Sequence, residues 1–227
     1  MNNLAIILAS GNSIRMSGID KATMKISGKP IISYSLEAFL ECDKFQKIIV
    51  TASNSNKNEI KNIVATYSSA NVSVVSGGVR RQDSVKNALD IGSDVDLVAV
   101  HDGARPFLTD RIILEGLKLA AIHAAAVPVI PVRDTIKELT PESEVVRTLD
   151  RSRLYGSQTP QFFDFDILQR AHEIVHDDVT DDSEMLEKLG HNPKTFKGDV
   201  RNLKITVKED IYIAEAYLEL KNNYDRI

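Results

Sequence analysis

The chain lacks the features that mark secreted, membrane and nucleic-acid-binding proteins. Its 227 residues include a single cysteine, Cys42, so no internal disulfide can form, which is typical of a reducing cytoplasm. No stretch approaches the roughly 20 consecutive apolar residues that span a bilayer, and no Lys or Arg precedes the first apolar run to mark a secretory signal. The formal net charge of −4 gives no general attraction to nucleic acid. We therefore expect a cytoplasmic protein without membrane or nucleic-acid partners, in which any anion site is built from a few local cations.

Apolar runs alternate with helical patterns through most of the sequence. The expected strands are residues 4–10, 47–52, 71–76, 96–101 and 125–132, with one more near 203–206. The expected helices are residues 30–41, 57–67, 82–91, 109–123, about 165–176, 183–189 and one from about 209. A repeated β-α-β order predicts an α/β fold of three layers, Rossmann-like, with a mainly parallel twisted sheet between helices. We expect residues 1–227 to form one domain.

Between about residues 134 and 155 this alternation stops. Residues 135–139 and 145–149 have the two-residue period of strands and are joined by a segment with turn chemistry. The hairpin is charged and has too few apolar residues for a core of its own. We therefore expect an inserted β-arm that packs on a second subunit; a hairpin folded back onto its own domain is the alternative.

The stretch 96–106 carries the strongest local signal of a site. A run of apolar residues typical of a strand buried on both faces breaks abruptly into His101, Asp102, Gly103, Ala104 and Arg105. In open α/β sheets, ligands bind at the carboxyl ends of the strands, where loops carry the chemistry. The stretch thus delivers a carboxylate and a guanidinium to that edge. An ion pair between Asp102 and Arg105 that closes a turn is the structural alternative.

A second strand-to-loop junction follows residues 4–10. There the chain reads Gly11-Asn12-Ser13-Ile14-Arg15-Met16, and Lys21 follows. Short loops with Gly and Ser let backbone N–H groups turn toward a phosphate, and nearby Arg and Lys neutralise its charge. The sequence is neither a Walker loop nor the dinucleotide fingerprint, whose later glycines are missing. It predicts a polyphosphate cradle, with a plain turn as the alternative.

Further short motifs accompany these two along the chain. The full ordered set is Leu8-Ala9-Ser10-Gly11 with Arg15-Met16 and Lys21; Gly77-Gly78 with Arg81-Gln82-Asp83-Ser84-Val85; His101 to Pro106; Val132-Arg133-Asp134-Thr135; Asp150-Arg151; Thr159-Pro160-Gln161-Phe162; Thr180-Asp181-Asp182; and Asn202-Leu203-Lys204-Ile205-Thr206. In this order, and over nearly the whole chain, they resemble the family of 2-C-methyl-D-erythritol 4-phosphate cytidylyltransferases of the non-mevalonate isoprenoid pathway.

The resemblance implies a nucleotidyltransferase fold and an enzyme that joins CTP to methylerythritol phosphate, releasing pyrophosphate and forming a cytidine diphosphate alcohol. It also implies Mg²⁺ or another divalent cation, held mainly by the phosphates of CTP. The nucleophile is a phosphate oxygen that is already anionic near neutral pH, so no side chain need deprotonate it. Fixed cations should instead offset the charge that develops as two phosphates meet.

The same resemblance assigns roles to individual residues. Arg15, Lys21 and Lys204 match the catalytic cations around the triphosphate. The nucleotide-binding positions are matched by Ala9, Ser10, Gly11, Gly77, Gly78, Ser84 and Asp102. Asp102 would lie near the ribose and the metal, and it is the one metal-ligand candidate; a capping or ion-pair role is the alternative.

On the acceptor side, the matching positions are Arg105, Thr135, Arg151, Thr159 and Thr180. Thr135 and Arg151 belong to the hairpin arm, which in the family crosses between subunits. The resemblance therefore implies a homodimer in which these two residues serve the neighbouring active site. An arginine fork suits this pocket because it grips phosphate oxygens bidentately.

The chain departs from the family pattern at two places. Ser13 stands where the loop usually has its second glycine, and Asp20-Lys21-Ala22 replaces the usual Pro-Lys-Gln. An exposed Asp20 beside Lys21 would weaken triphosphate binding by about 1 kcal/mol. These changes concern the loop and CTP affinity more than the reaction.

Two other functions fit the same pattern less well. A ribitol 5-phosphate cytidylyltransferase would share the fold and the chemistry but differ in the acceptor pocket, where Arg133-Asp134-Thr135 and Arg81 to Ser84 favour methylerythritol phosphate. A nucleotide-binding domain without activity would not need Arg15, Lys21 and Lys204 together. A turnover assay separates these alternatives.

Overall fold

A mixed sheet of eight strands runs through the centre of the molecule. The computed structural model describes residues 1–11, 20–67 and 71–224, with side chains up to residue 220. The sheet order is β10-β7-β11-β6-β1-β4-β5, and β12 pairs with β7. Its strands are β1 (Asn3–Ala9), β4 (Lys47–Ala52), β5 (Val72–Ser76), β6 (Leu97–Asp102), β7 (Ala125–Pro131), β10 (Tyr155–Ser157), β11 (Gln161–Asp164) and β12 (Lys194–Lys197). β10 and β11 run antiparallel to their neighbours, and the other pairings are parallel. The mainly parallel α/β sheet predicted from the sequence is confirmed.

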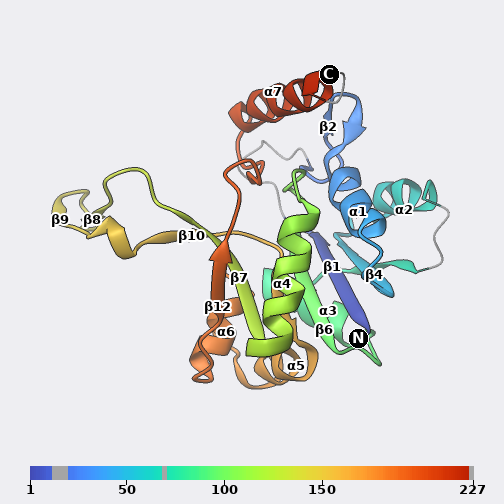
Figure 1. Cartoon of the computed structure of the whole chain (residues 1–227), viewed down its shortest axis with the longest axis horizontal. Coiled ribbons are helices and arrows are strands. Elements are labelled where there is room, and N and C mark those ends of the chain that lie inside the picture. Colours follow the sequence, from blue (N-terminus) through green and yellow to red (C-terminus); the bar gives the residue numbers. More distant parts are fainter. Residues whose placement is uncertain (12–19, 68–70, 225–227) are drawn as a thin grey trace.

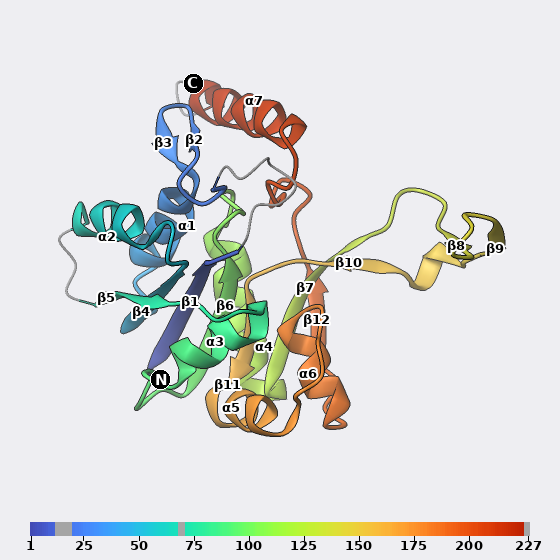
Figure 2. The same cartoon turned by 180° about the vertical axis from the view of Figure 1, so that it is seen from behind.

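Helices cover both faces of the sheet (Figures 1 and 2). One face is covered by α1 (Ile31–Glu41), α2 (Lys57–Ala65) and α4 (Asp110–His123), and the other by α3 (Arg81–Leu89), α5 (Phe165–Ile174) and α6 (Asp182–Lys188). The apolar side chains of β1 alternate between the two hydrophobic clusters: Ala5 and Ile7 pack with the first group, Leu4 and Ile6 with the second. Because successive side chains of a strand point to opposite faces, an unbroken apolar run is what a strand with two covered faces needs.

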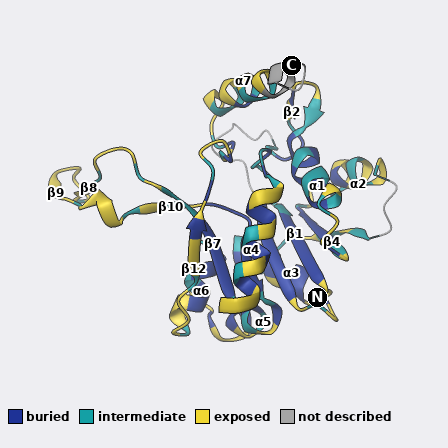
Figure 3. Ribbon diagram, in the orientation of Figure 1, coloured by how far each residue is buried: buried dark blue, intermediate teal, exposed yellow. Residues whose placement is uncertain are grey.

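The predicted hairpin protrudes from this body. It consists of β8 (Lys137–Leu139) and β9 (Val145–Thr148), followed by a 3₁₀ turn at Arg151–Arg153, and Figures 1 and 2 show it far from the sheet at the end of a long extension. Both strands are exposed along their whole length (Figure 3). The apolar side chains of Leu139, Val145 and Val146 are each more than half exposed. The arm thus carries apolar surface that the described part of this chain leaves uncovered.

The C-terminal part differs from the sequence-based expectation. The strand expected near residues 203–206 is wrong: this segment has no strand structure and makes one backbone hydrogen bond to the loop after β6, from the Ile205 N–H to the Ala104 carbonyl at 2.9 Å. The last helix, α7 (Glu209–Tyr224), packs instead near the small hairpin of β2 (Lys25–Ile26) and β3 (Lys29–Pro30), where Ile205 is fully buried. No helix within the described ranges is long and apolar enough to cross a membrane.

Candidate active site

A cavity of about 780 Å³ lies at the edge of the sheet where β1, β4, β5 and β6 end. This is the edge at which open α/β sheets bind ligands. Residues from well-separated parts of the sequence line it: Leu8, Ala9, Ser10, Gly11, Asp20, Lys21, Ala22, Ser53, Asn54, Gly77, Gly78, Val79, Arg80, Arg81, Ser84, Asp102, Ala104, Lys204, Ile205 and Thr206. All the residues predicted to bind the nucleotide are among them, and so are Lys21 and Lys204. Arg15 lies outside the described residues.

The glycine pair Gly77-Gly78 forms one wall of the cavity with Ser10 and Ser84. The Ser10 hydroxyl donates to the Ser84 Oγ at 2.9 Å, and the Gly78 N–H donates to the same oxygen at 3.0 Å. A Cβ on Gly77 would lie 2.2 Å from the Cβ of Ser10, and one on Gly78 would lie 2.2 Å from the Cβ of Asp83. Only glycine therefore fits at both positions, and the close approach leaves backbone groups as the surface that a ligand meets.

Three cationic side chains surround the carboxylate of Asp102, the last residue of β6. Its oxygens lie 2.8 Å from Lys204 Nζ, 3.5 Å from Arg81 Nε and 3.8 Å from Arg105 Nε. Burial opposes ionisation of Asp102, but Arg81, Lys204 and Arg105 together hold the pKa of that carboxyl well below its usual range. Burial lowers the pKa of Arg105, although Asp102 opposes this change. The carboxylate thus stays charged and keeps the Lys204 ammonium at the cavity wall.

Lys21 begins a turn that is tied to the end of β1. The Asp20 carboxylate accepts hydrogen bonds from the backbone N–H groups of Ala22 (2.9 Å) and Thr23 (3.3 Å), and also from the side-chain amide of Asn56. The same Asn56 amide donates to the Ala9 carbonyl at 2.7 Å. Asp20, which departs from the family pattern, thus caps the turn of Lys21. Asn56, the residue before α2, is not among the predicted site residues, because no local motif links it to Ala9 or Asp20.

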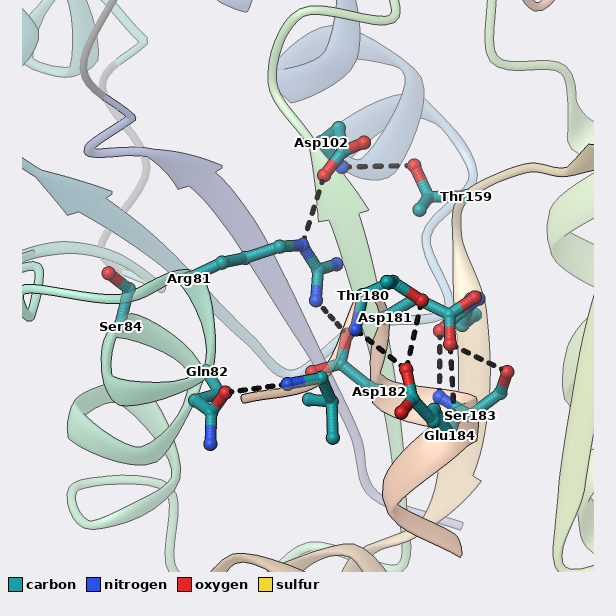
Figure 4. Close-up of polar contacts among 12 residues, drawn as sticks. Arg81, Gln82, Ser84, Asp102, Thr159, Thr180, Asp181, Asp182, Ser183 and Glu184 are labelled. Carbon is teal, nitrogen blue, oxygen red and sulfur yellow. Dashed lines mark hydrogen bonds and ion pairs between the residues drawn. The ribbon is translucent and has the colours of Figure 1, made fainter. Parts of the chain in front are cut away.

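None of the predicted acceptor residues is among those that line the cavity. Thr159 is buried, and its hydroxyl accepts from the Asp102 N–H at 3.0 Å (Figure 4). The same hydroxyl lies 3.2 Å from His101 Nδ1. Thr180 is exposed, in the loop before α6. Thr135 and Arg151 are exposed on the arm, where Arg151 donates to the Arg133 carbonyl. Arg105 is paired with Asp102 and donates to the Asn202 carbonyl at 2.7 Å.

The buried imidazole of His101 makes stability depend on pH. Its side chain is fully buried, and this burial lowers its pKa from 6.5 to about 4, because the protein disfavours the charged form. As pH falls from 6.5 to 4, the His101 imidazole becomes protonated in the unfolded chain but stays neutral in the folded chain. The free energy of unfolding should therefore fall by about 3 kcal/mol.

Urea denaturation of the wild type and of His101→Gln across this pH window measures that loss. The free energy of unfolding of the wild type, measured relative to that of His101→Gln, should fall steadily from pH 6.5 to pH 4. A difference that stays constant with pH would contradict a neutral, buried His101.

The fold and the cavity together define a nucleotide-binding enzyme of the nucleotidyltransferase class. The parallel strands β1, β4, β5 and β6 end at a cavity that is lined by a glycine pair, by Ser10 and Ser84, by Lys21, and by Lys204 beside the buried carboxylate of Asp102. Comparison with known proteins makes the assignment specific. The family model for 2-C-methyl-D-erythritol 4-phosphate cytidylyltransferase matches residues 3–220. The chain belongs to this family.

Individual relatives agree over nearly their whole length. A 2-C-methyl-D-erythritol 4-phosphate cytidylyltransferase of Dehalococcoides mccartyi is 41% identical over 216 residues, 95% of each chain, and one of Caldanaerobacter subterraneus is 38% identical over 225 residues, 96% of this chain and 99% of the relative. The crystal structure of 4-diphosphocytidyl-2C-methyl-D-erythritol synthase from Anaerococcus prevotii superimposes with a TM-score of 0.85 at 28% identity, covering 96% of each chain.

Proposed function

We propose that this protein transfers the cytidylyl group of CTP to 2-C-methyl-D-erythritol 4-phosphate and releases pyrophosphate. The observation that supports this most directly is that Lys21 and Lys204 line the same cavity as the glycine pair and Ser84. The acceptor phosphate oxygen forms a bond to the α-phosphorus of CTP. The bond from that phosphorus to the oxygen bridging to the β-phosphate breaks, and pyrophosphate leaves with the electron pair.

In this proposal the pyrimidine lies against the wall made by Gly77, Gly78 and Ser10. Backbone groups there can hydrogen-bond to the edge of the base. Ser84 would support this wall, because its hydroxyl accepts from Ser10 and from the Gly78 N–H and donates to the Arg80 carbonyl at 3.2 Å. The triphosphate then extends past Gly11 toward Lys21, and Lys204 faces the α-phosphate from the opposite side. Asp102 holds the Lys204 ammonium, and Asp20 caps the turn that carries Lys21, so both lysines are positioned before the substrates arrive. They can therefore stabilise the developing charge at little reorganisation cost.

We further propose Mg²⁺, or another divalent cation, as the metal of the reaction. Within the described part of the chain, no three His, Cys, Asp or Glu side chains gather into a metal site. Proteins often bind Mg²⁺ through only one or two carboxylates together with substrate phosphates, so a site with few protein ligands fits this ion. Two carboxylates line the cavity; Asp20 caps the turn of Lys21, and Asp102 could supply one ligand. The ion would neutralise charge on the triphosphate.

The arm supports a homodimer as a further proposal. Its exposed apolar residues and the exposed positions of Thr135 and Arg151 fit a role in a neighbouring subunit, where Arg151 would grip the acceptor phosphate. CTP and a polyol phosphate are the small-molecule partners. A cytoplasmic location and the absence of nucleic-acid partners stay predictions.

The test offers methylerythritol phosphate and ribitol 5-phosphate separately to the purified protein with CTP and Mg²⁺, and follows pyrophosphate release. We expect kcat/KM for methylerythritol phosphate to be at least ~100-fold higher, because a pocket that hydrogen-bonds one polyol leaves polar groups unpaired with another. A preference for ribitol 5-phosphate would show that the proposed acceptor is wrong. If neither polyol phosphate led to pyrophosphate release, the proposed reaction would be refuted. A parallel assay with EDTA tests the metal.

A further inference from the structure

Three consecutive residues directly after the glycine-pair loop bind a distant segment of the chain, residues 176–182, which carries Thr180. Arg80 donates to the His176 carbonyl at 2.9 Å. The Gln82 side-chain amide donates to the Asp177 carbonyl at 3.0 Å and accepts from the Val179 N–H at 3.2 Å. Both polar ends of Gln82 are therefore used to hold the backbone on either side of residue 178.

Arg81 makes the third link, to a fully buried carboxylate. Its Nη1 donates to the Asp182 carboxylate at 2.7 Å, and its Nε lies 3.5 Å from Asp102. Figure 4 shows the guanidinium between these two carboxylates. The Asp182 side chain has no exposed surface, and among the described residues its other oxygen has no hydrogen-bond partner. Arg81 thus compensates the buried charge of Asp182 while reaching the carboxylate that anchors Lys204.

The start of α6 sets the position of Thr180. The backbone N–H and the hydroxyl of Thr180 both donate to the Glu184 carboxylate, at 2.8 and 3.0 Å. The Asp181 carboxylate caps the helix by accepting from the Glu184 N–H at 3.1 Å. Since Asp182 is the first residue of α6, the Arg81–Asp182 ion pair fixes the turn that holds Thr180.

We propose that Arg81, Gln82 and Asp182 are positioning residues that hold the Thr180 segment beside the nucleotide cavity and so shape the acceptor side of the site. This inference rests on the proposed function for its substrate. Gln82 and Asp182 do not line the cavity, so their loss should leave the nucleotide wall in place. The effect should therefore fall on the acceptor and not on CTP.

The variants Gln82→Met and Asp182→Asn test this, because both keep the side-chain size approximately. For each we expect the KM for methylerythritol phosphate to rise at least ~10-fold, with the KM for CTP changed less than about twofold. Lys86→Met is the matched control: it lies on the same helix in a half-exposed ion pair with Asp90, and both KM values should stay as in the wild type. Equal rises in the two KM values, or a loss of thermal stability with neither KM changed, would overturn the proposal.

Hydrogen exchange supplies a readout that does not depend on turnover. Peptides covering residues 176–182 should exchange faster in Gln82→Met and Asp182→Asn than in the wild type, while peptides containing Gly77 and Gly78 should not change. Unchanged exchange in 176–182 would refute the positioning role even if the wild type proved inactive with every acceptor. Inactivity of the wild type would instead refute the proposed function, so the two failures are distinguishable.

Discussion

Replacing Lys21 by alanine is expected to lower kcat at least ~100-fold, which corresponds to about 2.7 kcal/mol of lost transition-state stabilisation. Lys21 lines the cavity at the start of a turn that the Asp20 carboxylate caps and that Asn56 ties to the end of β1. A cation held in this way meets the triphosphate without rearrangement. Steady-state kinetics with CTP and methylerythritol phosphate, following pyrophosphate release, measures the change.

Lys118→Ala is the matched control for this experiment. Lys118 is an exposed lysine of α4 that does not line the cavity, so its removal changes the net charge equally and should leave kcat unchanged. The melting temperature of Lys21→Ala should stay within a few degrees of the wild type, because the lysine is half-buried at a cavity wall. Near-normal kcat in Lys21→Ala would remove this lysine from the proposed mechanism.

The strands at the centre of the sheet could be predicted from the sequence because burial on both faces leaves a continuous apolar run. The expected range 47–52 coincides with β4, and the other ranges in the first half differ from β1, β5 and β6 by a residue at each end or less. β12 has no such signal: in Lys-Thr-Phe-Lys only Phe196 is buried, and pairing with β7 makes it a strand. The segment 203–206 has strand-like side chains, but the backbone bonds that a strand needs are not formed along it.

The residues of the candidate site likewise include some that the sequence predicts and some that only the folded structure reveals. The family resemblance assigns Gly77, Gly78 and Ser84 to the nucleotide site, and the structure shows that a Cβ at either glycine would clash. Arg81 lies within the same motif, yet its partner Asp182 follows 101 residues later. A role that depends on such a pairing appears only when the fold brings the starts of α3 and α6 together, which no local pattern encodes. His101 and Asn56 act through burial and backbone contacts that likewise appear only in the folded chain.

Replacing Asp102 by asparagine is expected to cost about 3 kcal/mol of stability, because removing one partner of a buried ion pair leaves the others uncompensated. The substitution keeps the shape of the side chain but leaves Arg105, whose side chain is 11% exposed, with no carboxylate partner among the described residues. For a chain of this size, the melting temperature should fall by roughly 6 to 12 °C. Asp90→Asn is the matched control, since that carboxylate is half-exposed at the C-cap of α3 and its ion pair with Lys86 contributes little.

The pH dependence of this difference identifies its cause. The cations around Asp102 lower its pKa in the folded chain below the ordinary 3.8, so the ionised carboxylate stabilises the protein fully above that value. This contribution is lost as pH falls toward the folded-state pKa. Urea denaturation should therefore show a constant stability gap between the wild type and Asp102→Asn from pH 7 to pH 5, and a narrowing gap below about pH 4. A stability gap that persists unchanged at pH 3 would show that packing, and not the charge of Asp102, produces the loss. A variant as stable as the wild type would show that Arg81, Arg105 and Lys204 do not depend on this carboxylate.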